Sequence, residues 1–186
     1  ARDEGFFLQV SARLRMLTRH SIPGWQPGIL YRVENIENGM NVLIHTAKPS
    51  GIELCALFDA VGWVGNDPLT LEASIAAYPC TLTARAADGT LIGYLSAFSD
   101  NVLTTMIGEL VVHAQYQRIG VGSALLRYLR DEFARTSVYA AVLPEAIEFF
   151  RANGFAEPSV GMAVMVARRS QLPSTPNVGT SRSPTR

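Results

Sequence analysis

Residues 106–126 read MIGELVVHAQYQRIGVGSALL, an apolar run that passes through two closely spaced glycines into a second apolar run. The first run belongs to residues 104–113, where β-branched and other apolar side chains follow one another as in a buried strand. The second run begins residues 122–134, where apolar side chains recur at the spacing of one helical face. A glycine-rich turn that feeds a helix leaves backbone N–H groups free at the positive end of the helix dipole. This stretch therefore predicts a strand, a turn suited to a pyrophosphate, and a helix.

The two best-known phosphate loops do not match this turn. A nucleoside-triphosphate loop ends in Gly-Lys-Ser/Thr, whereas the only lysine of the chain is Lys48. A dinucleotide fingerprint needs a third glycine at the position where Leu125 stands. Residue identity therefore excludes both of these nucleotide-binding classes.

Further strands and helices are predicted on both sides of the turn. The pattern predicts strands over residues 29–33, 41–46, 80–87, 91–96, 104–113, 138–142 and 160–166, and helices over residues 52–63, 68–78, 122–134 and 144–152. Asp88-Gly89 indicates a hairpin, because both residues accept positive φ at low cost. Hairpins followed by alternating strands and helices require one mixed, mostly antiparallel central sheet flanked by helices. The predicted fold class is α/β, or α+β, in a single domain.

The chain divides into three predicted segments. Residues 1–40 are an N-terminal extension with an amphipathic helix, because apolar residues recur there at helical spacing, at Phe6, Phe7, Val10, Leu14 and Leu17. This helix would lie over the body of the protein, or alternatively meet a membrane or a partner. Residues 41–170 form the domain itself. Residues 171–186 are a flexible tail, because their Ser, Thr, Pro and Gly offer little apolar surface to bury.

Composition excludes several classes of protein. The 186 residues are 48% hydrophobic and 17% charged, with a mean hydropathy of +0.15, so the chain is not disordered as a whole. Sixteen basic and sixteen acidic side chains give zero net charge, so neither nucleic acid nor an anionic membrane is an expected partner. Cys55 and Cys80 are too few for a disulfide framework and too isolated for a zinc site, and no metal is expected. No apolar run approaches the length of a membrane span, and we expect a cytoplasmic protein.

Three motifs together point to one family. Residues 117–122, QRIGVG, follow the pattern Gln/Arg, two residues, Gly, one residue, Gly/Ala. An acid-apolar-Val-Val-His strand end over residues 109–113 precedes this loop, and residues 146–155 read AIEFFRANGF. Over about residues 41–168 the chain resembles the GNAT superfamily of acyl-coenzyme A-dependent N-acetyltransferases. The resemblance implies a GNAT-like domain that uses acetyl-coenzyme A as its cosubstrate.

By position, the resemblance implies a coenzyme site built largely from main chain. The amides of residues 118–123 would bind the pyrophosphate, with Gly120 and Gly122 allowing close approach. The end of the preceding strand would pair with the pantetheine arm as an added strand does, and one of its amides would polarise the thioester carbonyl. Asn153 would contact the coenzyme or simply cap a helix. The predicted coenzyme-binding residues are Leu110, Val111, Val112, His113, Gln117, Arg118, Ile119, Gly120, Val121, Gly122, Ser123 and Asn153.

The predicted catalytic residues are Glu109 and Tyr139. The attacking amine has to lose a proton, and Glu109 stands in an otherwise apolar strand, where a carboxyl becomes a better proton acceptor. Alternatively, Glu109 is a structural acid bonded to a neighbouring loop. Phe150 stands where the family often has a tyrosine that protonates the departing thiolate. Tyr139 or water would supply that proton. Alternatively, the thiolate would leave unprotonated, because a thiol with a pKa of about 8.5 has a stable anion. By fold analogy, Phe58 and Trp63 would line the acceptor pocket.

The function implied by the resemblance is acetyl transfer to a primary amine of a small molecule or peptide, by direct attack in a ternary complex. The mildly acidic domain gives slight support to a cationic amine. One alternative is a non-catalytic acyl-coenzyme A-binding regulator, which Phe150 favours. A second is a toxin that acetylates aminoacyl-tRNA, against which zero net charge argues. A homodimer is a further expectation, with the N-terminal helix as its contact.

Overall fold

The computed structural model describes residues 14–17, 29–35 and 40–161. Within these ranges lie the strands β1 (Leu14–Leu17), β2 (Ile29–Asn35), β3 (Met40–His45), β4 (Cys80–Arg85), β5 (Leu91–Ser99), β6 (Thr104–Val112) and β7 (Ser137–Ala140). The helices are α1 (Gly51–Asp59), α2 (Pro68–Ala77), α3 (Val121–Glu132) and α4 (Ile147–Ala152), with 3-10 turns at Ala114–Tyr116 and Pro144–Ala146. The described residues up to Ala156 belong to one compact unit, and residues 157–161 belong to a second.

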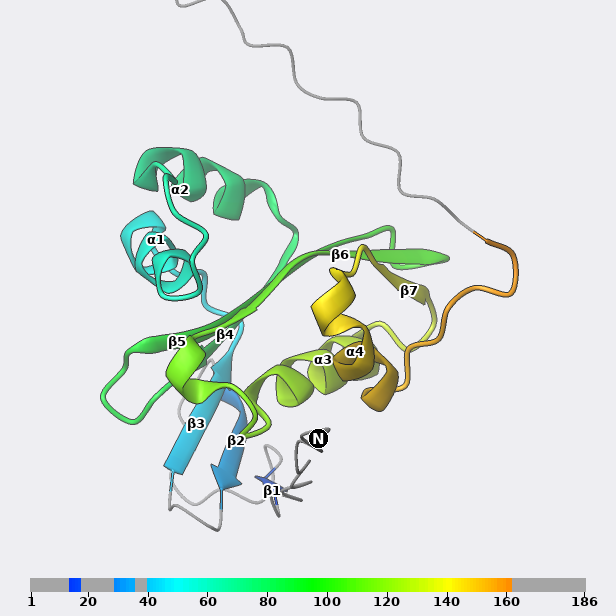
Figure 1. The fold of residues 1–186 in the computed structure, drawn as a ribbon, viewed down its shortest axis with the longest axis horizontal. Coiled ribbons are helices and arrows are strands. Elements are labelled where there is room, and N and C mark those ends of the chain that lie inside the picture. The colour runs from blue at the N-terminus through cyan, green and yellow to red at the C-terminus, as the bar shows by residue number, and fades with distance from the viewer. Residues whose placement is uncertain (1–13, 18–28, 36–39, 162–186) are drawn as a thin grey trace, which may run out of the picture. The chain divides into compact units, whose positions relative to one another are not determined.

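A seven-stranded sheet forms the centre of the first unit (Figure 1). Its strands lie in chain order, and every neighbouring pair is antiparallel except β6 and β7, which are parallel. This parallel step follows from α3, because a helical crossover carries the chain back to start β7 in the same direction as β6. The predicted mixed, mostly antiparallel sheet flanked by helices is confirmed.

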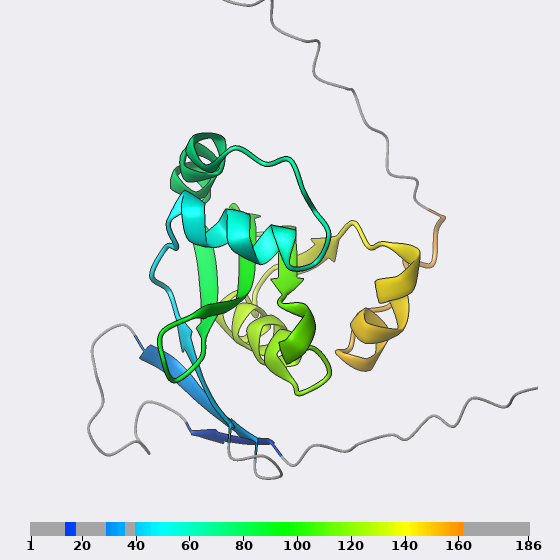
Figure 2. The same ribbon diagram turned by 60° about the vertical axis from the view of Figure 1, so that its left-hand side comes forward.

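Helices cover both faces of the sheet. Figures 1 and 2 show α1 and α2 on one face and α3 and α4 on the other. On the α1–α2 face, Leu57 and Ile75 pack with Tyr94 and Val111 of the sheet. On the α3–α4 face the core is larger, and its fully buried side chains include Ile44, Leu82, Ile92, Leu95, Leu125, Leu126 and Leu129. Each face of the sheet therefore has its own apolar core.

Local signals explain where the helices begin. Ser50 and Glu53 form a reciprocal capping box at the start of α1, and Asp67 caps α2 just before Pro68. The helix predicted over residues 68–78 is thus confirmed. The helix predicted over residues 52–63 ends early, at Asp59, because the chain turns through Gly62 in the left-handed region (φ 84°).

The N-terminal prediction is partly wrong. Leu14–Leu17 is a strand, paired antiparallel with β2, instead of the end of an amphipathic helix. The segment Leu14-Arg15-Met16-Leu17 fits both periodicities over four residues, and pairing with β2 decides between them. Phe6, Phe7 and Val10 lie outside the described residues. The strand predicted over residues 29–33 is confirmed by β2.

The C-terminal predictions are mostly outside the described residues. The strand expected over residues 160–166 is described only at Val160 and Gly161, which are not in a strand. The tail over residues 171–186 lies outside the described residues. The domain boundaries at 40 and 170 stay predictions.

Candidate active site

The second half of β6 separates from β7. The two strands pair from Thr104↔Ser137 to Ile107↔Ala140, and residues 108–112 of β6 lie beyond this pairing. On its other side, β6 stays paired with β5 to the end of the strand, as far as Gly93↔Val112. One edge of the second half of β6 is therefore open to an added chain.

Strand geometry decides which main-chain groups reach this open edge. The His113 N–H donates to the Ile92 carbonyl of β5 at 2.9 Å. Because successive residues of a strand point their main-chain groups to opposite sides, Val111 also faces β5, and Leu110 and Val112 face the open edge. All four residues from Leu110 to His113 were predicted to offer edge groups. In the structure only Leu110 and Val112 do so.

Gln117 and His113 fix the loop that follows β6. The Gln117 side chain donates from Nε2 to the Val112 carbonyl at 3.0 Å, and His113 Nδ1 accepts from the Gln115 N–H at 3.2 Å. The Gln117 side chain thus ties the loop back to the strand and occupies an edge carbonyl. The N–H of Val112 and both main-chain groups of Leu110 remain on the edge.

The loop ends in an open helix terminus. Gly120 is the N-cap of α3 with φ 91°, a left-handed conformation that favours glycine, and no side chain caps this end of the helix. The N–H groups of the first turn, at Val121, Gly122 and Ser123, therefore point to the positive end of the dipole without a side-chain acceptor. Arg118 is exposed beside them, also with positive φ (62°). These residues fit a pyrophosphate.

Gly122 also has a packing role that the sequence did not predict, and its approach to the coenzyme stays a prediction. A Cβ at this position would lie 3.0 Å from Cζ of Phe149 in α4. The missing side chain therefore serves the packing of α4 on α3 as well as any approach of a ligand. Val121 is 1% exposed and belongs to the core on the α3–α4 face, and Ile119 packs against that core. A ligand can therefore reach only the main chain of these two residues.

Glu109 stands on a β-bulge. Leu95 pairs with Leu110 and Ala97 with Ile107, so β6 has one more residue than β5 between these pairs. The bulge consists of Gly108 and Glu109, opposite Ser96. A Cβ on Gly108 would lie 2.3 Å from the Tyr78 hydroxyl oxygen, so any larger residue here would displace the Tyr78 side chain.

Two hydroxyl groups hold the Glu109 carboxylate. The Glu109 N–H donates to Ser96 Oγ at 2.9 Å, and the Ser96 hydroxyl donates back to Glu109 Oε2. Tyr78, the residue that ends α2, donates from its hydroxyl to Glu109 Oε1 at 3.1 Å. Burial raises the pKa of Tyr78, and the Glu109 charge raises it further, so Tyr78 stays a donor at neutral pH.

The sequence did not predict Tyr78 or Ser96 as site residues. They stand 31 and 13 residues before Glu109, and no local motif marks either of them. Pairing of β5 with β6 and packing of α2 on the sheet bring them together. The only available hint was the polar Ser96 within the apolar run of β5.

The structure also places three other predicted residues, Tyr139, Phe150 and Asn153. Tyr139 is 41% exposed and pairs with Met106, on the same sheet face as Glu109. Phe150 is buried, with its ring centroid 5.4 Å from Phe149 and 5.1 Å from Phe155, and is a core residue. The side chain of Asn153 donates to the Phe149 carbonyl at 2.8 Å and caps α4, and its contact with coenzyme stays a prediction.

Three further side chains bear on the chemistry. Phe58 is buried and packs edge-on against Trp63, which is 40% exposed, with ring centroids 5.3 Å apart. Their place in an acceptor pocket stays a prediction. Burial raises the pKa of Cys80 to about 11, so this thiol is a poor nucleophile at neutral pH.

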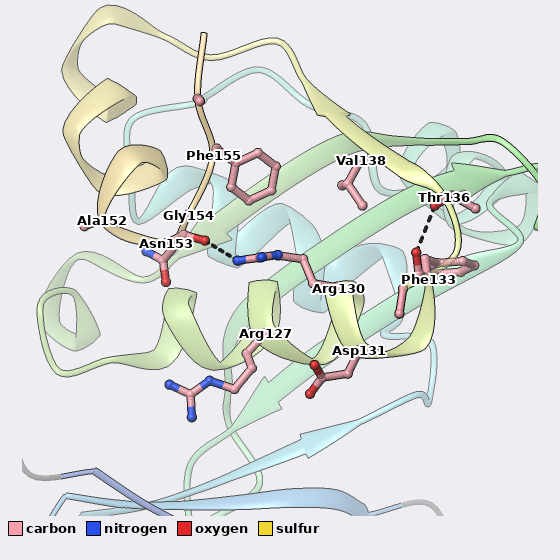
Figure 3. Close-up of a pocket in the computed structure, with 12 residues that line it drawn as sticks. Arg127, Arg130, Asp131, Phe133, Thr136, Val138, Ala152, Asn153, Gly154 and Phe155 are labelled. Atoms are coloured by element: carbon pink, nitrogen blue, oxygen red, sulfur yellow. Dashed lines mark hydrogen bonds between the residues drawn. The ribbon is translucent and has the colours of Figure 1, made fainter. Parts of the chain in front are cut away.

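An open cavity of about 830 Å³ lies elsewhere, between the second half of α3, β7 and the end of α4 (Figure 3). Arg130 crosses it, donates to the Asn153 carbonyl at 2.6 Å and lies 5.9 Å from the Phe155 ring centroid. Of the predicted site residues only Asn153 lines it.

Among the described residues, no three His, Cys, Asp or Glu side chains gather as a metal site. Nor does any helix in the described ranges have the length and apolarity to cross a membrane.

Comparison with known proteins identifies the family. The model of the acetyltransferase (GNAT) family matches residues 53–155, which include most of α1, the bulge, the glycine loop and α4. The chain belongs to this family. It is 27% identical to the uncharacterized N-acetyltransferase ycf52 of Porphyra purpurea, over 66% of this chain and 74% of that protein. It is 24% identical to ycf52 of Pyropia yezoensis, over 61% and 68%.

A solved structure of this family has the same fold. The GNAT-family acetyltransferase of Streptococcus pneumoniae TIGR4 aligns with 70% of this chain and 99% of its own, with a TM-score of 0.58 and 20% identity. The chain therefore shares the fold of this family as well as its sequence pattern.

Proposed function

We propose that this acetyltransferase transfers the acetyl group of acetyl-coenzyme A to a primary amine of a small molecule or peptide, by direct attack in a ternary complex. The observation that carries the proposal is the hydroxyl-bound Glu109 carboxylate on a bulge beside the open edge of β6. A proton acceptor and a free strand edge then lie on consecutive residues, Glu109 and Leu110.

Main-chain groups supply the coenzyme half of this site. The amides of the first turn of α3 bind the pyrophosphate, and the edge groups of Leu110 and Val112 pair with the pantetheine amides. A thioester carbonyl bound this way accepts a hydrogen bond from an edge N–H. Of the two edge N–H groups, that of Leu110 is nearer to Glu109. Such a donor stabilises the negative charge that develops on the carbonyl oxygen during attack.

Side chains supply the other half. The amine nitrogen attacks the carbonyl carbon, Glu109 accepts the proton that the amine loses, and the carbon–sulfur bond breaks as the thiolate leaves. Tyr78 and Ser96 orient the carboxylate for this step. Phe150 cannot protonate the thiolate, so Tyr139 or water does so, or the thiolate leaves as an anion, as the low pKa of a thiol permits.

Calorimetric titration with acetyl-coenzyme A, followed by thiol release against a set of primary amines, tests the proposal. Saturable binding with amine-dependent thiol release supports it. Binding without release on any amine would instead support the non-catalytic regulator, which the buried Phe150 favours. Absence of coenzyme binding would contradict the assignment of the loop. The cytoplasmic location, the homodimer and the absence of nucleic-acid or membrane partners stay predictions.

A further inference from the structure

An exposed apolar row crosses three strands beside Glu109. It consists of Phe98 in β5, Met106 in β6 and Tyr139 in β7, which are 48%, 44% and 41% exposed. The register pairs Phe98 with Met106 and Met106 with Tyr139, so the three side chains stand side by side on one face. Neighbouring strands are about 4.8 Å apart, so the row is about 10 Å long.

The row lies on the same face as the Glu109 carboxylate. Tyr94, Ser96 and Phe98 alternate along β5 and share one side of the sheet, where Tyr94 packs against α1 and α2. Ser96 bonds Glu109 on that side, and Phe98 continues it beyond the bulge. Helices α1 and α2 bury Tyr94 but leave Phe98 half exposed.

Tyr78 joins the row to the carboxylate. Its hydroxyl donates to Glu109, and its ring lies against Phe98 with centroids 4.4 Å apart at 38°. One residue thus contacts both the anionic group and the apolar surface. Met106 and Glu109 are three residues apart, roughly 10 Å at most along a strand.

We propose that the apolar row binds the carbon skeleton of the acceptor, and that the acceptor is an arylalkylamine, an aromatic ring carried on a short alkyl arm that ends in a primary amine. This inference rests on the proposed function and deepens it. The ammonium group complements the Glu109 carboxylate, and the ring lies on a surface whose three side chains carry no charge. A short arm spans the distance between them.

The same surface disfavours strongly polar amines. A polyamine or an aminosugar would lose hydration of its further polar groups over the row without gaining hydrogen bonds from it. An aromatic ring instead gains apolar contact with Met106 and ring contacts with Phe98 and Tyr139. The row therefore selects among amines that Glu109 alone would accept equally.

The test compares initial rates of thiol release with 2-phenylethylamine, ethanolamine and putrescine, using acetyl-coenzyme A and the full chain. We expect kcat/KM for 2-phenylethylamine to exceed that for both polar amines by about tenfold or more. Met106→Gln should reduce this preference about tenfold, mainly through KM. Leu69→Gln, at a 79% exposed leucine of α2, is the matched control and should leave the preference unchanged.

Binding is measured separately, by saturation-transfer NMR of 2-phenylethylamine with the protein and coenzyme A. If 2-phenylethylamine binds and Met106→Gln abolishes binding, but no amine releases thiol, the row is supported and the proposed transferase is overturned. If polar amines turn over as well as 2-phenylethylamine, the transferase stands and the row is overturned. A Met106→Gln variant that loses a dimer in sedimentation, with unchanged amine preference, would make the row a contact between two copies and also overturn the inference.

Discussion

The two halves of the site, on either side of the bulge in β6, are built from different parts of the chain. The coenzyme half uses main-chain groups of Leu110, Val112 and the first turn of α3, which are close in sequence. The acceptor half uses side chains from β6, β5 and the end of α2, joined by the hydrogen bonds of Glu109. Main-chain recognition depends on backbone conformation and so on glycine, whereas side-chain recognition depends on tertiary contacts. A substitution in one half should therefore leave the other half largely intact.

The largest expected effect is on the coenzyme half. Gly120→Glu places a side chain and a negative charge on a left-handed residue next to the proposed phosphate site, and we expect coenzyme affinity to fall by about a hundredfold or more. Calorimetry measures this loss. Gly89→Glu is the control, because Gly89 has nearly the same φ (89°) in an open turn. Equal loss in both variants would show strain alone and contradict the assigned site.

Glu109→Gln should separate the two halves. Removing the proton acceptor should lower kcat about a hundredfold or more, and coenzyme affinity should stay within about twofold. Thiol-release rates and calorimetry give the two values, with Glu148→Gln, at an exposed carboxylate, as the matched control. If the variant keeps the rate and pH profile of the wild type, Glu109 is a structural acid and not the base.

Gly108→Ala tests the bulge itself. The added Cβ would lie 2.3 Å from the Tyr78 hydroxyl and 2.8 Å from Ser96 Oγ, so it should displace both donors from the carboxylate. We expect kcat to fall roughly thirtyfold. This loss lies between that expected for Glu109→Gln, which removes the base, and that expected for Tyr78→Phe, which removes one donor. A circular-dichroism melt checks that the variant folds. Loss of coenzyme affinity as large as the loss of rate would mean that the halves are not independent.

Tyr78→Phe removes one donor and keeps the ring on Phe98. Tyr78 is a positioning residue, so we expect a fall in kcat of about tenfold with little change in KM. An unchanged kcat, with the same melting temperature, would remove Tyr78 from the acceptor half.

The smallest effect concerns the scaffold beneath both halves. Glu53 in α1 accepts from Arg85 of β4 at 2.5 Å, and this hydrogen bond lowers the pKa of Glu53 from 4.5 to about 2. A lowered pKa adds stability that is complete above about pH 4.5 and is lost as the pH falls toward 2. Glu53 is 38% exposed, so Glu53→Gln should cost only about 1 kcal/mol at pH 7. Urea unfolding at pH 7 and pH 2.5 should show that difference shrink, with coenzyme affinity unchanged at pH 7.

Prediction succeeded where the signal was local. The hairpin at Asp88-Gly89, the strand before the glycine loop and α3 were all recognisable, because turn chemistry and apolar periodicity act within a few residues. Prediction failed at Leu14–Leu17, where four residues fit a helix or a strand and the partner strand decided. It was incomplete at Gly122, because its neighbour Phe149 comes from a helix 27 residues further on.

The sequence by itself determined the family, the order of strands and helices over residues 29–152 and the glycine-rich turn before α3, since each depends on neighbouring residues. Only the tertiary structure decided which main-chain groups of β6 are free, because that depends on the side from which β5 pairs. It also decided that Tyr78 and Ser96 hold Glu109, and that Phe98, Met106 and Tyr139 form one surface. Contacts between side chains far apart in the chain arise from register and packing, and these are properties of the assembled sheet.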